Sequence, residues 1–165
     1  VTQRKIRTIK TGTVRIALGS EADNGKMVNI VPIGLNYSNP HQFRSVCFVS
    51  IGKPINSKMP ELKGLTGSDL THKYTELVKE SMRENVIHLE DESVFDLFEK
   101  VKKIVLHEQQ NFDGKMPTQQ KQFELGQQIQ DAIAYYAKEY PITIQKLNQK
   151  LDQLLFVLMK VSLVR

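Results

Sequence analysis

Two hydrophobic periodicities divide this chain, and they limit what it can fold into. Up to about residue 57, apolar residues occur in short β-branched runs, at 28–37 and 44–51, which predict strands. From residue 66 onward, apolar residues recur every three or four positions, as in helices that bury one face. The segment between these parts contains residues that interrupt regular structure, Pro60, Gly64 and Gly67. We therefore predict an α/β domain over residues 1–60 and a helical extension over residues 66–165.

The first part is expected to hold a short helix flanking the remainder of a mixed sheet of two or three strands. The helix should begin at Gly12, bury a face that includes Val14 and Ala17, and end at Gly25. The strand at 28–37 is apolar nearly throughout its centre, which is typical of a strand covered on both faces.

About four helices are expected in the second part. Ser68 and Asp69 can cap the first, Thr118 opens the third, and Pro141 ends it because proline lacks an amide hydrogen. The apolar run at 154–159 is too short to cross a bilayer, which needs ~20 residues. It is compatible with a helix packed on the α/β part, an interfacial helix on lipid, or the start of a longer hydrophobic segment.

Charge is distributed unevenly, although the net charge is only +5. Five cations precede the first acid, Glu21: Arg4, Lys5, Arg7, Lys10 and Arg15. This end should attract phosphate groups or anionic lipid, unless it is simply a solvated basic edge. Nucleic acid is a poor match because Trp is absent and no aromatic residue lies within the basic run. The single cysteine, Cys47, excludes an internal disulfide and fits a reducing compartment.

Three short motifs occur in order between residues 8 and 57. They are Lys10-Thr11-Gly12, Val31-Pro32-Ile33 and Gly52-Lys53-Pro54-Ile55. Their succession resembles the later part of the glycerolipid acyltransferase domain, the family that acylates glycerol 3-phosphate or lysophosphatidic acid. The first residue is Val, so we expect the rest of such a domain to lie upstream of it.

The resemblance implies roles for three residues. Lys10 and Gly12 match the Lys-x-Gly pair that begins a helix in this family, and a helix start can bind phosphate. Pro32 matches a strand proline that lines the substrate cavity in the family; the alternative is an edge-strand proline without a ligand. Arg4, Lys5, Arg7 and Arg15 are further candidates for phosphate or anionic lipid on electrostatic grounds alone.

No catalytic residue is predicted within the chain. The family uses a His-x4-Asp dyad in which His deprotonates the acceptor hydroxyl. The residues five positions after the four histidines are Val46, Leu77, Ser93 and Phe112. We therefore expect this chain alone to be inactive, with an acyl-CoA or acyl-carrier-protein thioester as co-substrate of the complete enzyme and no cofactor. No metal site is predicted either, because the acids after His88 are better explained as a helix start.

The resemblance places such an enzyme on the cytoplasmic face of a membrane as a peripheral protein of phospholipid biosynthesis. Its partners would be glycerol phosphate or a lysophospholipid, the thioester donor and the membrane surface. An alternative is a stand-alone helical module that binds a partner or forms homo-oligomers, with a basic end for anionic lipid. The Gln-rich third helix and the apolar last helix would suit that function.

Overall fold

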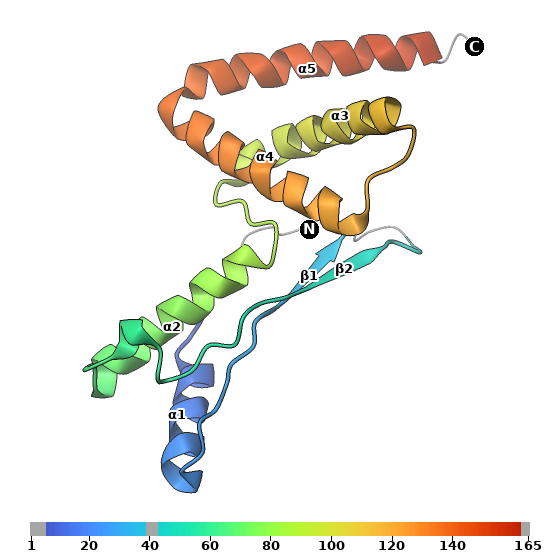
Figure 1. Cartoon of the computed structure of the whole chain (residues 1–165). Coiled ribbons are helices and arrows are strands. Elements are labelled where there is room, and N and C mark those ends of the chain that lie inside the picture. The colour runs from blue at the N-terminus through green and yellow to red at the C-terminus, as the bar shows by residue number, and fades with distance from the viewer. Residues whose placement is uncertain (1–5, 39–42, 163–165) are drawn as a thin grey trace. The chain divides into compact units, whose positions relative to one another are not determined.

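The computed structural model describes residues 6–38 and 43–162, which form a mixed α/β structure with a helical carboxy-terminal region (Figure 1). The chain divides into two compact units, Val1–His88 and Leu89–Arg165. The division thus falls after the first long helix of the predicted extension, not between residues 60 and 66. This helix belongs to the first unit because it contacts the amino-terminal helix.

Unit 1 begins with helix α1, Gly12–Asn24, which starts and ends at the predicted glycines. Gly25 ends it in the left-handed region at φ 64°. Strands β1, Ile33–Tyr37, and β2, Cys47–Ile51, then form an antiparallel hairpin, extended by an isolated bridge between Ile30 and Ile55. Within the described residues, the sheet is therefore a two-stranded antiparallel pair and not a mixed sheet.

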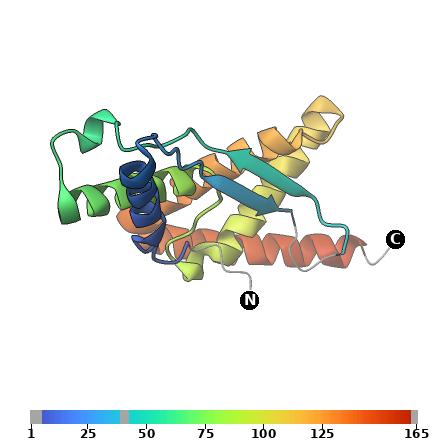
Figure 2. The ribbon, with the colours of Figure 1, turned by 90° about the horizontal axis from the view of Figure 1, so that it is seen from below.

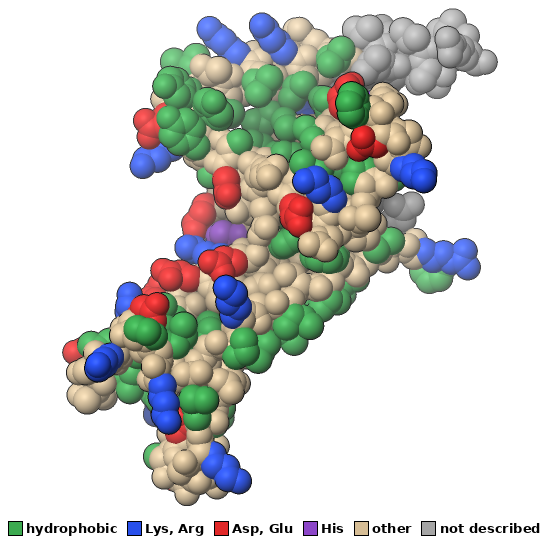
Figure 3. Space-filling view, in the orientation of Figure 1, with side chains coloured by type: hydrophobic (Ala, Val, Ile, Leu, Met, Phe, Trp, Pro, Cys, Tyr) green, Lys and Arg blue, Asp and Glu red, His purple; other side chains and the backbone are tan. Residues whose placement is uncertain are grey.

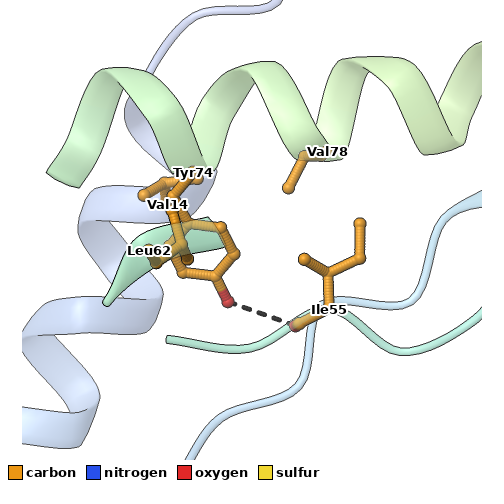
Figure 4. Packing of buried hydrophobic residues seen from close by; sticks show 5 residues of the cluster. All are labelled: Val14, Ile55, Leu62, Tyr74 and Val78. Atoms are coloured by element: carbon orange, nitrogen blue, oxygen red, sulfur yellow. Dashed lines mark hydrogen bonds between the residues drawn. The ribbon is translucent and has the colours of Figure 1, made fainter. Parts of the chain in front are cut away.

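Helix α2, Gly67–Glu84, follows the short 3-10 turn η1, Pro60–Leu62, and crosses α1 (Figures 1 and 2). Between them lies a small core made of Val14, Ile55, Leu62, Tyr74 and Val78 (Figure 4). Tyr74 has no exposed surface, and its hydroxyl donates a hydrogen bond to the Ile55 carbonyl at 3.1 Å. This hydrogen bond thus links α2 to the segment of chain that follows β2.

The hairpin is attached to the end of α2 through Asn85, which is 6% exposed. The Asn85 side chain accepts from the Ser50 hydroxyl at 2.7 Å and donates to the Ser81 carbonyl at 2.7 Å. Its backbone carbonyl accepts from the Asn36 amide group at 2.9 Å. Gly34 allows this close approach, because an added Cβ would lie 1.7 Å from the Asn85 carbonyl oxygen. The face of the hairpin that carries Gly34, Asn36, Phe48 and Ser50 is therefore bonded to the end of α2 through its two polar side chains.

The opposite face of the hairpin, which we call the outer face, corrects the expectation of a strand covered on both sides. Leu35 is 55% exposed and Ile51 is 70% exposed. Cross-strand register and strand alternation place the following residues on this face: Ile33, Leu35, Tyr37, Cys47, Val49 and Ile51. Hydrophobic side chains follow the hairpin in Figure 3. The apolar run thus has one face on α2 and the other in solvent.

Unit 2 contains the short turn η2, Glu92–Val94, and three helices: α3, Phe95–Asp113, α4, Gln119–Glu139, and α5, Pro141–Ser162. With α2 they make the four helices predicted after residue 66. Thr118 caps α4 by accepting from the Lys121 amide, and Pro141 opens α5. The core of the unit lies between α3 and α4, with α5 against α4. The buried hydrophobic residues of the described part of the unit are Leu89, Val94, Leu97, Phe98, Leu125, Ile129 and Ile133.

Lys100 connects α3 to α5. Its side chain is 12% exposed, it forms ion pairs with Asp96 and Asp152, and it donates to the Asn148 side-chain oxygen at 3.0 Å. Hydrogen bonds to Asp152 and then Asp96 raise the pKa of Lys100 above its ordinary value. This contribution to stability is therefore fully present below the unfolded-state pKa and is lost as the pH rises through the raised folded-state pKa.

Replacing Lys100 by alanine should loosen α5 and lower the free energy of unfolding by about 1 kcal/mol. The cost is modest because Asp96 and Asp152 are more than half exposed and regain water. Urea unfolding at neutral pH measures the change. Lys103→Ala, at an exposed position on the same helix, serves as the control and should change stability by less than about 0.5 kcal/mol. Equal effects of the two variants would contradict a special role for Lys100.

Candidate functional site

The start of α1 is the first candidate site. Lys10 is exposed, and α1 begins at Gly12, so the prediction that the Lys-x-Gly pair opens a helix is confirmed. The Thr11 side chain makes no capping hydrogen bond, and the first turn carries no acidic residue. A Cβ at Gly12 would meet nothing within 4 Å, so a ligand can approach the backbone there. The helix start thus has the geometry of an anion site, and phosphate binding stays a prediction.

The basic residues around this helix start differ in their placement. Arg15 lies exposed in the first turn of α1, and Arg7 is exposed upstream of it. Lys10 and Arg15 place exposed positive charge near the start of α1, which favours anions there. The predicted Arg4 and Lys5 lie outside the described residues.

Pro32 lies immediately before β1 and is buried. Its carbonyl oxygen accepts a hydrogen bond from the Gly52 amide at 2.8 Å, so the chain still pairs at this position although proline donates nothing. Pro32 lies just before the first residue of β1, so its missing amide hydrogen interrupts no hydrogen bond within the strand pair. This placement agrees with the ligand-free alternative for Pro32, and its contact with substrate stays a prediction.

Two pockets lie on the described part of the chain away from these residues, since neither of the two is lined by Lys10, Gly12 or Pro32. The first, of about 340 Å³, is an open apolar groove between α3, α4 and α5 in unit 2. Its lining includes Val105, Ile129, Ile133, Tyr136 and Leu147. The second, of about 640 Å³, lies along the loop at residues 57–65. Sequence reasoning missed the groove, because it arises where three separately predicted helices meet.

Three histidines lie within the described residues, His72, His88 and His107. His88 is 7% exposed, and its Nδ1 accepts a hydrogen bond from the Ile6 amide at 2.9 Å, a structural role. The His107 Nδ1 lies 3.1 Å from the Asn111 side-chain nitrogen. His41 lies outside the described residues. Among the residues that the structure describes, no group of three or more His, Cys, Asp or Glu side chains is placed to hold a metal ion.

Comparison with known proteins found no matching family model, no matching curated protein and no matching solved structure. The resemblance to the acyltransferase domain therefore depends on the three motifs alone. Within the described part of the chain, no helix has both the length and the apolar character needed to cross a membrane.

Proposed function

We propose that this chain is the carboxy-terminal part of a glycerolipid acyltransferase domain followed by a helical extension. The complete enzyme moves an acyl group from a coenzyme A or carrier-protein thioester to a hydroxyl of glycerol phosphate or lysophosphatidate. The observation that carries the proposal is the Lys10-x-Gly12 pair at the first residues of α1, followed by Val31-Pro32-Ile33 at the entrance of β1. Lys10-x-Gly12 thus opens a helix as the resemblance implies, whereas Val31 and Pro32 lie just before β1 and not in the middle of a strand.

In this proposal the start of α1 binds the phosphate of the acceptor. Lys10 and Arg15 supply charge, and the uncapped first turn supplies amide groups. Pro32 forms part of the cavity wall next to β1. None of the four histidines is followed by Asp five positions later, so this proposal assigns deprotonation of the acceptor hydroxyl to a His-x4-Asp segment upstream. The enzyme acts on the cytoplasmic face of a membrane as a peripheral protein.

We expect the 165-residue chain alone to show no acyl transfer above background. A longer protein that carries a His-x4-Asp segment upstream of this chain should transfer acyl groups to glycerol 3-phosphate or lysophosphatidate, because that segment supplies the general base. Release of free coenzyme A thiol from an acyl-CoA donor measures turnover, and an acyl-carrier-protein donor is tested in parallel. Turnover by the 165-residue chain, or an upstream reading frame without His-x4-Asp, would contradict the proposal.

A second candidate function is a stand-alone helical module for binding a partner or another copy of the chain, with its basic end on anionic lipid. The apolar groove of unit 2 favours it. Exposed apolar residues also lie at the junction of α4 and α5: Tyr135, Tyr136, Tyr140, Ile142 and Leu147. Light scattering distinguishes the two, since a module that self-associates through the groove should form oligomers, and Leu147→Asn, at a groove residue that is 40% exposed, should weaken them. A monomer at all concentrations counts against self-association.

A further inference from the structure

The free edge of strand β2 carries backbone groups that point out of the hairpin. The Gly52 amide donates to the Pro32 carbonyl at 2.8 Å, and the Ser38 amide donates in the same way at 2.8 Å to a β2-side carbonyl, that of Val46. Given the cross-strand register, the even-numbered residues therefore exchange hydrogen bonds across the hairpin. The amide and carbonyl groups of the odd-numbered residues then point outward. On β2 these residues are Cys47, Val49 and Ile51.

Within the described residues, no other strand pairs with this edge. The sheet has two strands, and no backbone hydrogen bond joins Cys47, Val49 or Ile51 to a segment outside the hairpin. The strand contains no charged residue and no proline, which are the usual means of keeping another strand away from an open edge. The edge can therefore pair with an added extended strand, whose backbone would satisfy the outward groups.

The two edges of the hairpin are not equivalent. Strand β1 contains Gly34 and Asn36, which are poor strand formers. Strand β2 has the sequence Cys-Phe-Val-Ser-Ile, in which Phe, Val and Ile favour strands. Val49 and Ile51 are 49% and 70% exposed, so this strand is accessible. An added strand therefore pairs more favourably along β2 than along β1.

The residues of β2 are complementary to themselves. In an antiparallel pairing centred on Val49, this residue lies opposite Val49 of a second copy, and Cys47 lies opposite Ile51. These side chains share the outer face, so apolar groups meet apolar groups and no like charges lie opposite each other. A pairing with this two-fold symmetry closes on two chains and leaves no further β2 edge exposed. The strand that fits this edge is thus β2 itself.

We propose that the chain forms a two-fold dimer through antiparallel pairing of β2 with β2 of a second copy. The product is one sheet in the order β1-β2-β2-β1, in which the outer faces of both hairpins form a continuous surface. An isolated two-stranded hairpin is only marginally stable, whereas a wider sheet with an apolar face is stable, and this difference drives the association. The dimer is independent of the acyltransferase proposal and of the groove in unit 2.

A cysteine on the two-fold axis tests this pairing. In a Cys47→Ser background, which removes the single native cysteine, Val49→Cys would place two cysteine Cα atoms about 5.5 Å apart, within the range for a disulfide. Mild oxidation at micromolar concentration should link this variant into covalent dimers at least about tenfold faster than a control, because paired cysteines react at a high effective concentration. The control is Phe112→Cys in the same background, since Phe112 is 92% exposed on α3 in the other unit. Equal rates would overturn the proposal.

Proline at position 49 separates the edge from the hairpin. The Val49 amide points away from β1, so Val49→Pro should keep the hairpin and remove the central donor of the dimer. Sedimentation velocity from micromolar to millimolar concentration should show dimers of the wild type and a dissociation constant at least about tenfold higher for Val49→Pro. Leu35→Pro, on the outward edge of β1, is the matched control and should leave the dissociation constant unchanged.

Each other outcome contradicts the dimer. A wild type that stays monomeric throughout the concentration range overturns it. Dimers that persist in Val49→Pro but are lost in Leu147→Asn would assign self-association to the groove of unit 2 and overturn pairing through β2. Circular dichroism shows whether the proline variants fold, and where they do not, the cross-linking rates of Val49→Cys and Phe112→Cys decide.

Discussion

Replacing Gly34 by alanine is expected to detach the hairpin from α2 and to destabilise unit 1 by about 3 kcal/mol or more. An added Cβ would lie 1.7 Å from the Asn85 carbonyl oxygen and 2.6 Å from its carbonyl carbon. Both are backbone atoms, so no side-chain rotation relieves the clash. The hairpin must move away, and the bonds from Asn36 and Ser50 to Asn85 are then lost together.

Urea unfolding followed by circular dichroism measures the loss for Gly34→Ala, and hydrogen exchange locates it. Amide protection should fall in β1 and β2 and remain in α3 and α4. Gly19→Ala is the matched control, because a Cβ at Gly19 meets nothing within 4 Å inside α1. It should be neutral or stabilising by up to about 1 kcal/mol, since alanine favours helix. A Gly34→Ala protein as stable as the wild type would show that the hairpin does not approach α2 this closely.

Several element boundaries in this chain were predictable because local residues determine them. The expected cap at Ser68 and Asp69 was wrong, because α2 begins at Gly67 after Thr66 and has no side-chain capping hydrogen bond. Gly12 and Gly25 limit α1, and Thr118 and Pro141 limit α4 and begin α5. In each case the cause lies within a turn of the boundary, as a left-handed glycine, a side-chain cap or a missing amide hydrogen.

Tertiary features were not predictable in the same way. The apolar run around β1 was expected to be covered on both faces, but sequence cannot tell which side of an isolated hairpin meets a helix. Asn85 determines which face of the hairpin meets α2, because it accepts hydrogen bonds from Asn36 on β1 and Ser50 on β2. It lies 51 positions from Gly34 along the chain. The same long-range contact joins α2 to unit 1. The composition of the linker at 56–67 had instead predicted that α2 belongs to the helical extension.

The candidate site was predictable only in part for a related reason. The helix start after Lys10 is a local feature, and the structure has it. A cavity that joins Lys10 to Pro32 depends on how separate segments meet, and neither described pocket contains them. The groove of unit 2 and the Lys100–Asp152 contact likewise depend on helix packing that sequence periodicity does not specify.

Tyr74 should make the stability of unit 1 depend on alkaline pH. Burial, and next the negative charge of Glu21, raise the pKa of Tyr74 from 10.0 to about 12. The folded chain therefore binds the phenolic proton more tightly than the unfolded chain does. Stability from this group is fully present below pH ~10 and is lost as the pH rises from ~10 to ~12.

Two substitutions separate the hydroxyl of Tyr74 from its ring. Tyr74→Phe should cost only about 1 kcal/mol at neutral pH, because the Ile55 carbonyl still accepts from the Ile30 amide at 2.8 Å. It should also flatten the decline in stability above pH ~10, since phenylalanine does not titrate. Tyr74→Ala empties the centre of the core between Val14, Leu62 and Val78 and should cost about 3–5 kcal/mol at every pH.

Urea unfolding at neutral pH and at about pH 11, followed by circular dichroism, compares the three proteins. Tyr135→Phe is the control, because that ring is 57% exposed in unit 2 and its titration should not affect unit 1. If Tyr74→Phe loses as much stability as the wild type between the two pH values, the alkaline decline comes from other groups. A Tyr74→Ala protein that unfolds like the wild type would mean that this ring does not fill the core between α1 and α2.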